Sequence, residues 1–240
     1  MEAIELSKEF VFEGGEQAIQ GYEWGQGNKV VLLLHGWAGR GSQLHNFIAP
    51  LNELGYKVVA IDGPAHGRST GKTTHILHYA DAILNVKKLY PDIEAIIAHS
   101  FGGAASIQAV RLGLEIKKLI TIGTPTIGDY IINDFLRRIN GSPRSGDRFK
   151  ENVVKQFNRT FDEFSMMNTI ELVKDNMDML MIHDKDDREV PVQHAKDLQI
   201  KAPWVNLHIT EGLGHMRILK DKSVIAECCA FVEEEKLELA

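Results

Sequence analysis

The chain has 240 residues, of which 44% are hydrophobic and 25% charged, a composition typical of a globular protein that buries a sizeable core. Its formal net charge of −6 at pH 7 argues against a general nucleic-acid-binding protein, which would carry a basic excess. The only cysteines, Cys228 and Cys229, are adjacent, which excludes a disulfide framework and favours a reducing compartment.

The N-terminal region carries acidic side chains within its apolar stretch, which is unlike a signal peptide. No apolar run approaches the roughly 20 residues that a membrane-spanning helix needs. The sequence therefore predicts a cytoplasmic protein that has neither a membrane nor a nucleic acid as its partner.

Strand and helix patterns alternate along the chain. Residues 4–12 and 18–24 flank a Gly-Gly turn and predict an antiparallel hairpin. Further strands, most of them continuous apolar runs typical of burial on both faces, are predicted at 29–35, 57–62, 93–100, 117–124, 178–184 and 205–210. Helices are predicted at 42–55, 73–90 and 101–113, after Pro191, and from about Arg217 onward. This alternation predicts a single α/β domain over residues 1–240, with a doubly wound, mostly parallel sheet opened by the hairpin.

Residues 126–176 interrupt the alternation, because they contain helical stretches and no strand pattern between two predicted strands. An excursion of that length at the carboxyl edge of a sheet predicts a helical cap inserted over a binding site. Phe161 and Met166 are two apolar residues of this segment that we expect at the substrate pocket.

Part of the same segment is rich in basic residues. Residues 137–159 contain Asp147 and Glu151 against seven cations: Arg137, Arg138, Arg144, Arg148, Lys150, Lys155 and Arg159. The pattern is typical of a solvated face, and it also fits a docking surface for an anionic carrier of the substrate.

The stretch IIAHSFGGAAS, residues 96–106, joins a strand directly to a helix. Such a joint strains the residue at the corner, here Ser100, and pushes its side chain out above the sheet. Strand and helix nearly touch there, so Ala98 and Gly102 must be small. The N–H of Phe101 has no acceptor inside its helix, because it belongs to the first turn. The joint therefore predicts a hydroxyl beside a hydrogen-bond donor for an oxyanion.

Five segments in chain order resemble the α/β-hydrolase family: LLLHGWAGRG, AIDGPAHGRS, AHSFGG, HDKDDREVP and GLGHM. They cover nearly the whole chain except the predicted cap, although Ala98 stands where the G-x-S-x-G motif of the family has its first glycine. The resemblance implies that Ser100 is the nucleophile, that His215 is its base, and that an acid follows the strand at 178–184.

Three carboxylates compete for the role of the acid: Asp184, Asp186 and Asp187. The pattern of the family places the acid three residues before a Val-Pro pair, and Val190 with Pro191 then selects Asp187. We expect the other two carboxylates to be solvated loop residues.

The resemblance also implies that the backbone N–H of Trp37 is the second oxyanion donor, beside that of Phe101. We expect the indole of Trp37 either to line the acyl pocket or to serve only in packing. His35 is expected to stabilise the loop that carries Trp37, whereas His66 and His99 are expected to take no direct part in the chemistry. No metal is predicted, because His75 and His78 lack a carboxylate-rich partner motif.

These features predict a serine hydrolase that cleaves a small carboxylic ester or thioester through an acyl-enzyme on Ser100, with no cofactor. A carbon–carbon bond hydrolase of the β-diketone type would use the same three residues. A non-catalytic, ligand-binding member of the fold would usually lack one of them. Dehalogenases and epoxide hydrolases need a carboxylate where Ser100 stands.

Overall fold

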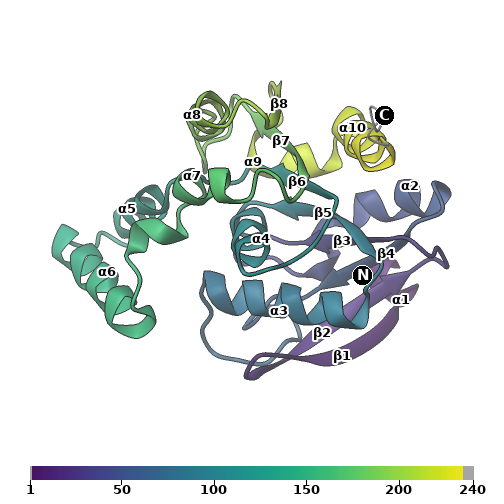
Figure 1. Cartoon of the computed structure of the whole chain (residues 1–240), viewed down its shortest axis with the longest axis horizontal. Coiled ribbons are helices and arrows are strands. Elements are labelled where there is room, and N and C mark those ends of the chain that lie inside the picture. Colours follow the sequence, from purple (N-terminus) through teal and green to yellow (C-terminus); the bar gives the residue numbers. More distant parts are fainter. Residues whose placement is uncertain (1, 235–240) are drawn as a thin grey trace.

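Eight strands form one sheet: β1 (Lys8–Gly14), β2 (Gln17–Trp24), β3 (Val30–Leu34), β4 (Lys57–Ile61), β5 (Ile93–His99), β6 (Lys118–Ile122), β7 (Asp178–Asp184) and β8 (Asn206–Thr210). In this computed structural model, which describes residues 2–234, the strand order is β1-β2-β4-β3-β5-β6-β7-β8 (Figure 1). The pairs β1–β2 and β2–β4 are antiparallel, and the other neighbouring strands are parallel. The predicted doubly wound sheet with an N-terminal antiparallel hairpin is confirmed.

The strands are connected by α-helices and by short 3₁₀ helices. The α-helices are α1 (Glu2–Glu5), α2 (Ile48–Glu53), α3 (Ile76–Leu89), α4 (Phe101–Arg111), α5 (Gly128–Arg138), α6 (Pro143–Phe157), α7 (Met166–Thr169), α8 (Gln193–Lys201), α9 (Gly214–Arg217) and α10 (Lys222–Glu233). The 3₁₀ helices are η1 (Gly41–Phe47), η2 (Phe161–Phe164), η3 (Ile170–Leu172) and η4 (Ile218–Lys220).

Several predicted helix and strand limits are wrong; the helix expected over 73–90, for example, begins only at Ile76. The strand expected over 4–12 begins only at Lys8, because α1 occupies the residues before it. The helix expected over 42–55 is divided into η1 and α2. The last long helix begins at Lys222 rather than near Arg217, because the Asp221 side chain accepts hydrogen bonds from the first backbone N–H groups and so fixes the start of α10.

Helices cover both faces of the sheet, and each face has its own hydrophobic core. Successive residues of a strand point to opposite faces, so Leu32 and Leu34 pack with α3, α4 and α8, whereas Val31 and Leu33 pack with α2 and α10. Both cysteines are free, and Cys228 lies buried in the second core, as the sequence indicated. Among residues 2–234, no helix has both the length and the apolar character needed to cross a lipid bilayer.

The segment between β6 and β7 is helical, and its outer part stands away from the sheet in Figure 1. Within it, α5 packs on α6 and η2, while α7 packs on α4 of the main body. We call residues 126–176 the helical insertion. Its role as a cap over a ligand stays a prediction.

The joint between β5 and α4 leaves no room for a side chain at Gly102. A Cβ atom there would lie 2.6 Å from the carbonyl oxygen of His35 and 3.0 Å from that of Leu34. Both atoms belong to the backbone of β3 and the loop after it, so neither can rotate away. The close approach of strand and helix expected from the sequence is confirmed.

Gly102→Ala should therefore destabilise the protein. Alanine normally stabilises a helix interior relative to glycine by roughly 0.5–1 kcal/mol, but overpacking against the backbone costs about 1–3 kcal/mol. We expect a net loss in the free energy of unfolding, measured with urea. Gly146→Ala in α6 is the control, since its nearest contact is the end of the flexible Leu136 side chain at 2.8 Å. An equal loss in both variants would contradict this explanation.

Candidate active site

Ser100 occupies a strained corner between β5 and α4. Its φ of 50° and ψ of −116° lie in a region that residues with a side chain rarely adopt, at a cost of about 1–3 kcal/mol. The neighbouring strand fixes this conformation, because the Ser100 N–H donates to the Ile122 carbonyl at 2.9 Å and the Thr124 hydroxyl donates to the Ser100 carbonyl at 3.1 Å. The Ser100 side chain is half-buried at the start of α4. The predicted corner geometry is present.

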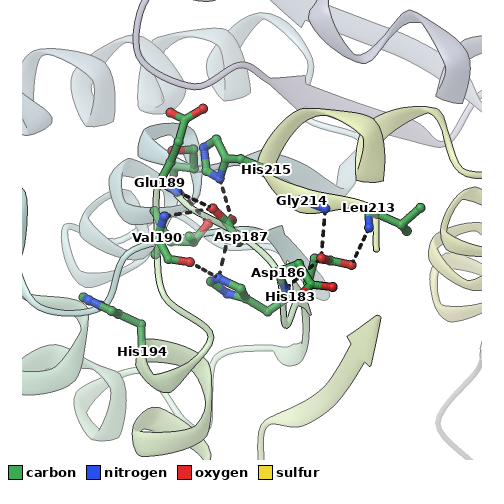
Figure 2. A network of polar contacts seen from close by, with 12 residues as sticks. His183, Asp186, Asp187, Glu189, Val190, His194, Leu213, Gly214 and His215 are labelled. Carbon is green, nitrogen blue, oxygen red and sulfur yellow. Dashed lines mark hydrogen bonds and ion pairs between the residues drawn. The ribbon is translucent and has the colours of Figure 1, made fainter. Parts of the chain in front are cut away.

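Asp187 and His215 meet across the ends of two neighbouring strands, β7 and β8 (Figure 2). The Asp187 Oδ2 to His215 Nδ1 distance is 2.7 Å, and both residues are buried. A carboxylate only accepts hydrogen bonds, so the His215 proton is on Nδ1 and Nε2 of the neutral ring is free to accept a proton. The structure therefore joins the acid and the base that the resemblance selected.

The orientation of the Asp187 carboxylate is fixed by its own loop. Its Oδ1 accepts the N–H groups of Glu189 at 2.8 Å and Val190 at 2.9 Å. Burial by itself would raise the pKa of Asp187, but the hydrogen bond from His215 and the two amides outweigh it and lower the pKa below its usual value. Asp187 is thus held as a carboxylate.

Asp184 is buried, and the expectation that it would be a solvated loop residue is wrong. Its Oδ1 accepts the N–H of Gly214 at 2.8 Å, and its Oδ2 accepts the N–H of Leu213 at 3.0 Å and the hydroxyl of Thr210 at 2.7 Å. Asp186 is exposed, but its Oδ2 accepts the N–H of Gly212 at 2.9 Å. Both carboxylates therefore hold the loop that presents His215.

His99, the residue before Ser100, contacts His215. Its ring lies 4.5 Å from that of His215, and its Nε2–H donates to the His215 carbonyl oxygen at 3.0 Å. Burial, and then the proximity of His215, lowers the pKa of His99 to about 3, so this imidazole is neutral. A Cβ on Gly36 would lie 2.8 Å from His99 Nδ1 and 3.0 Å from Ser100 Cβ. His99 thus packs between the base and the loop after β3.

Ser100 and His215 lie on adjoining segments, but among residues 2–234 no hydrogen bond joins the serine hydroxyl to the imidazole. The backbone at Gly123 lies against the imidazole, since a Cβ on Gly123 would lie 3.1 Å from His215 Nδ1. Catalytic hydrogen bonds are often long or misaligned before a substrate binds.

The loop after β3 presents Trp37 beside the start of α4. The loop is held by the N–H of Ala38, which donates to His66 Nε2 at 3.1 Å, and by His35, whose Nδ1–H donates to the Gly36 carbonyl at 2.7 Å. His35 Nε2 also accepts the N–H of Gly63 at 2.7 Å, which confirms its expected structural role. Within the described chain, the backbone N–H groups of Trp37 and Phe101 have no hydrogen-bond acceptor.

The indole of Trp37 is 61% exposed and packs edge-on against Phe101, with ring centres 5.2 Å apart. Met166, one of the two predicted pocket residues of the helical insertion, is 2% exposed and belongs to the hydrophobic core. The other, Phe161, packs on Phe149 and beside Gly128 within the insertion. Contact of a substrate with Phe161 or Trp37 stays a prediction.

The basic stretch of the insertion is largely exposed at Arg144, Arg148 and Lys155, while Lys150 pairs with Asp129 at 2.7 Å. The side chain of Arg138 lies outside the described part of the structure. Docking of an anionic carrier stays a prediction. Over residues 2–234, no group of three or more histidine, cysteine, aspartate or glutamate side chains is arranged to hold a metal ion.

Residues 29–171 match the family model described as the alpha/beta hydrolase fold, which is more than half of the chain. The chain belongs to the alpha/beta hydrolase family. It is 33% identical over 108 residues to a serine hydrolase-like protein of Dictyostelium discoideum, a stretch that covers 41% of this chain and 30% of that protein. A serine hydrolase-like protein of Danio rerio is 32% identical over 91 residues, covering 35% of this chain and 28% of its own length. This alpha/beta hydrolase therefore aligns with less than a third of the length of these relatives.

Solved structures of the same fold include an esterase from Pyrococcus furiosus, with a TM-score of 0.71, 21% identity, and coverage of 95% of this chain and 91% of that one. The thioesterase domain from the curacin biosynthetic pathway has a TM-score of 0.69, 17% identity, and coverage of 95% and 99%. Identities this low establish the shared fold alone.

Sequence reasoning missed the contacts of Asp184 and His99 with the His215 loop. Asp184 ends an apolar strand. A charged residue at the buried end of a strand needs hydrogen-bond partners, so the position of Asp184 in the sequence could have indicated these contacts. His99 sits next to the nucleophile, but nothing in the spacing indicates that its ring reaches a loop 116 residues further along the chain.

Asp184→Asn should loosen the His215 loop of this alpha/beta hydrolase. Burial would raise the pKa of Asp184, but hydrogen bonds from Gly214, Thr210, Leu213 and Asp186 lower it. A carboxylate whose pKa is lower in the folded protein than in the unfolded chain stabilises the fold at pH values above its unfolded pKa of about 3.9. This stabilisation is lost as the pH falls through the pKa of the folded state. We expect the variant to lose about 1–3 kcal/mol of unfolding free energy at pH 7. The difference in unfolding free energy between the wild type and the variant should become smaller below about pH 3.9. Urea unfolding at several pH values tests this, and a gap that does not change with pH would contradict it.

Proposed function

We propose that this alpha/beta hydrolase is a serine hydrolase that cleaves a carboxylic ester or thioester through an acyl-enzyme on Ser100. One observation carries the proposal: a buried carboxylate orients an imidazole at the same sheet edge as a strained serine. The family membership and the serine hydrolase-like relatives support it, as do structural neighbours named as an esterase and a thioesterase.

In the proposed acylation step, the Ser100 side chain rotates toward His215. His215 Nε2 accepts the hydroxyl proton while Oγ attacks the carbonyl carbon of the substrate. The negative charge that develops on the carbonyl oxygen is stabilised by the N–H groups of Trp37 and Phe101, each typically contributing about 3–4 kcal/mol in the transition state. Asp187 stabilises the imidazolium. His215 then returns the proton to the departing alcohol or thiol.

Deacylation repeats these steps with water as the nucleophile. His215 takes a proton from the water, the water oxygen attacks the acyl carbon, and Ser100 leaves with the proton restored to Oγ. The exposed indole of Trp37, edge-on to Phe101, supplies an apolar wall beside the reacting carbonyl. Every group used belongs to the chain, and the proposal calls for no cofactor.

Ser100→Ala should abolish hydrolysis of p-nitrophenyl acetate while leaving the fold and the thermal midpoint close to those of the wild type. The reason is that only the attacking oxygen is removed. Labelling by a fluorophosphonate probe should vanish in the same variant. Wild-type protein that neither labels nor turns over an ester panel would instead favour a non-catalytic, ligand-binding protein.

Asp187→Asn should lower kcat by about 10⁴-fold, because the amide no longer selects the Nδ1–H tautomer of His215. Asp186→Asn, at the preceding residue, is the matched control, and it should cost far less because the Asp186 carboxylate accepts the N–H of Gly212 rather than a proton of His215. Steady-state kinetics on p-nitrophenyl acetate compares them. A larger loss in the Asp186 variant would reassign the acid.

A substrate panel separates the reaction types that the same three residues support. Esters and thioesters of graded acyl length should be hydrolysed in preference to β-diketones. Preferential cleavage of the diketones would reassign the protein as a carbon–carbon bond hydrolase.

A further inference from the structure

Two backbone carbonyls of the short loop that carries Asp187 accept hydrogen bonds from side chains in different parts of the fold. The amides of Glu189 and Val190 both donate to Asp187 Oδ1. The Val190 carbonyl accepts the Nε2–H of His183, a residue of the sheet, at 2.8 Å. The Glu189 carbonyl accepts the hydroxyl of Tyr130, a residue of α5 in the helical insertion, at 3.2 Å. The acid loop is therefore fixed by the sheet on one side, where Figure 2 shows His183 beside Val190, and by the insertion on the other.

The ring of Tyr130 is also anchored. It packs edge-on against His194 of α8, with ring centres 4.5 Å apart. His194 is 4% exposed, and its Nδ1 accepts the N–H of Thr126, where the chain enters the insertion, at 3.1 Å. The hydroxyl of Ser165, also in the insertion, donates to the Thr126 carbonyl at 2.7 Å. Thr126 thus links His194, the ring partner of Tyr130, to Ser165.

The position of α5 is set mainly by other helices of the insertion. Its main packing partners are α6 and η2, which both lie within residues 126–176. A displacement of α5 relative to the sheet would therefore be transmitted to the Glu189 carbonyl through the Tyr130 hydroxyl. The Glu189 carbonyl shares its planar peptide group with the Val190 N–H, which donates to Asp187 Oδ1 at 2.9 Å, so the displacement reaches the carboxylate.

We propose that Tyr130 is a positioning residue that couples the helical insertion to the triad acid. The orientation of the Asp187 carboxylate, and with it the Asp187–His215 hydrogen bond, depends on where α5 lies. A ligand that shifts the insertion then changes the strength of the acid–base pair without touching either residue. The consequence for catalysis rests on the proposed function, but the coupling itself does not.

Tyr130→Phe removes the hydroxyl and keeps the ring against His194. The first measurement is the downfield proton NMR resonance of His215 Nδ1–H, which reports its hydrogen bond to Asp187 whether or not the protein turns over a substrate. We expect this resonance to shift or broaden in the variant. Tyr90→Phe is the matched control, because the Tyr90 hydroxyl donates to Glu23 away from this loop, and it should leave the resonance unchanged.

The second measurement is the pH profile of p-nitrophenyl acetate hydrolysis. A less well oriented carboxylate stabilises the imidazolium less, so the acid limb of kcat/KM should move to lower pH in Tyr130→Phe. We expect kcat to fall about 2- to 10-fold, the effect of losing one neutral hydrogen bond, with KM unchanged. Tyr130→Met should behave like Tyr130→Phe if the hydroxyl carries the coupling.

The two proposals fail in different ways. A wild-type protein without turnover or fluorophosphonate labelling contradicts the serine hydrolase, and the NMR comparison still tests Tyr130. An unchanged His215 resonance in both folded Tyr130 variants overturns the coupling, even where esters are hydrolysed. A loss of thermal stability with an unchanged resonance and an unchanged pH profile also overturns it, because it shows a purely structural contact.

Discussion

The candidate site depends on one hydrogen bond, which joins Asp187 Oδ2 to His215 Nδ1 at 2.7 Å. It links the loops after β7 and β8, two parallel neighbours whose carboxyl ends lie at the same edge of the sheet. The carboxylate accepts only, so it fixes both the tautomer and the rotation of the imidazole. Without that contact, the imidazole ring could turn and exchange tautomers.

Three aspartates within four residues together hold that imidazole and its loop in place. Asp184 accepts hydrogen bonds from the backbone at Leu213 and Gly214, and Asp186 accepts one from Gly212, so Asp187 is left to the His215 side chain. Burial of carboxylates this close together is unfavourable by itself, since desolvation and mutual repulsion both favour the protonated form. Convergent N–H donors reverse that balance, and the pKa values of Asp184 and Asp187 are both lowered. The loop and the charges therefore stabilise each other.

Much of this arrangement could be predicted from local patterns. Apolar runs and small residues defined the strands and the corner at Ser100, since both are dictated by neighbours in the chain. The resemblance to the α/β-hydrolase family, through the position of Val190 and Pro191, selected Asp187, which does contact His215. The contacts of Asp184, His99 and Tyr130 could not be predicted in this way.

Those three missed contacts share a physical cause. Asp184 accepts hydrogen bonds from backbone amides, which are present in every sequence and so leave no recognisable pattern in it. The partner of His99 is a carbonyl 116 residues away, and the partner of Tyr130 is one 59 residues away. Each contact exists only because the sheet brings the strand ends together. The exact start of α10 depended likewise on a local detail, the Asp221 side chain, that apolar spacing does not reveal.

Burial keeps two imidazoles around the site, His35 and His99, in the neutral form. A neutral imidazole has one donor and one acceptor nitrogen, which is what His35 needs to bridge the Gly36 carbonyl and the Gly63 amide. Protonation would set an N–H against the N–H of Gly63 and break the bridge. Burial lowers the pKa of His35 to about 4 and that of His99 to about 3, so neither gains a proton near neutral pH. The hydrogen bonds that these two imidazoles make around the site are therefore kept near neutral pH.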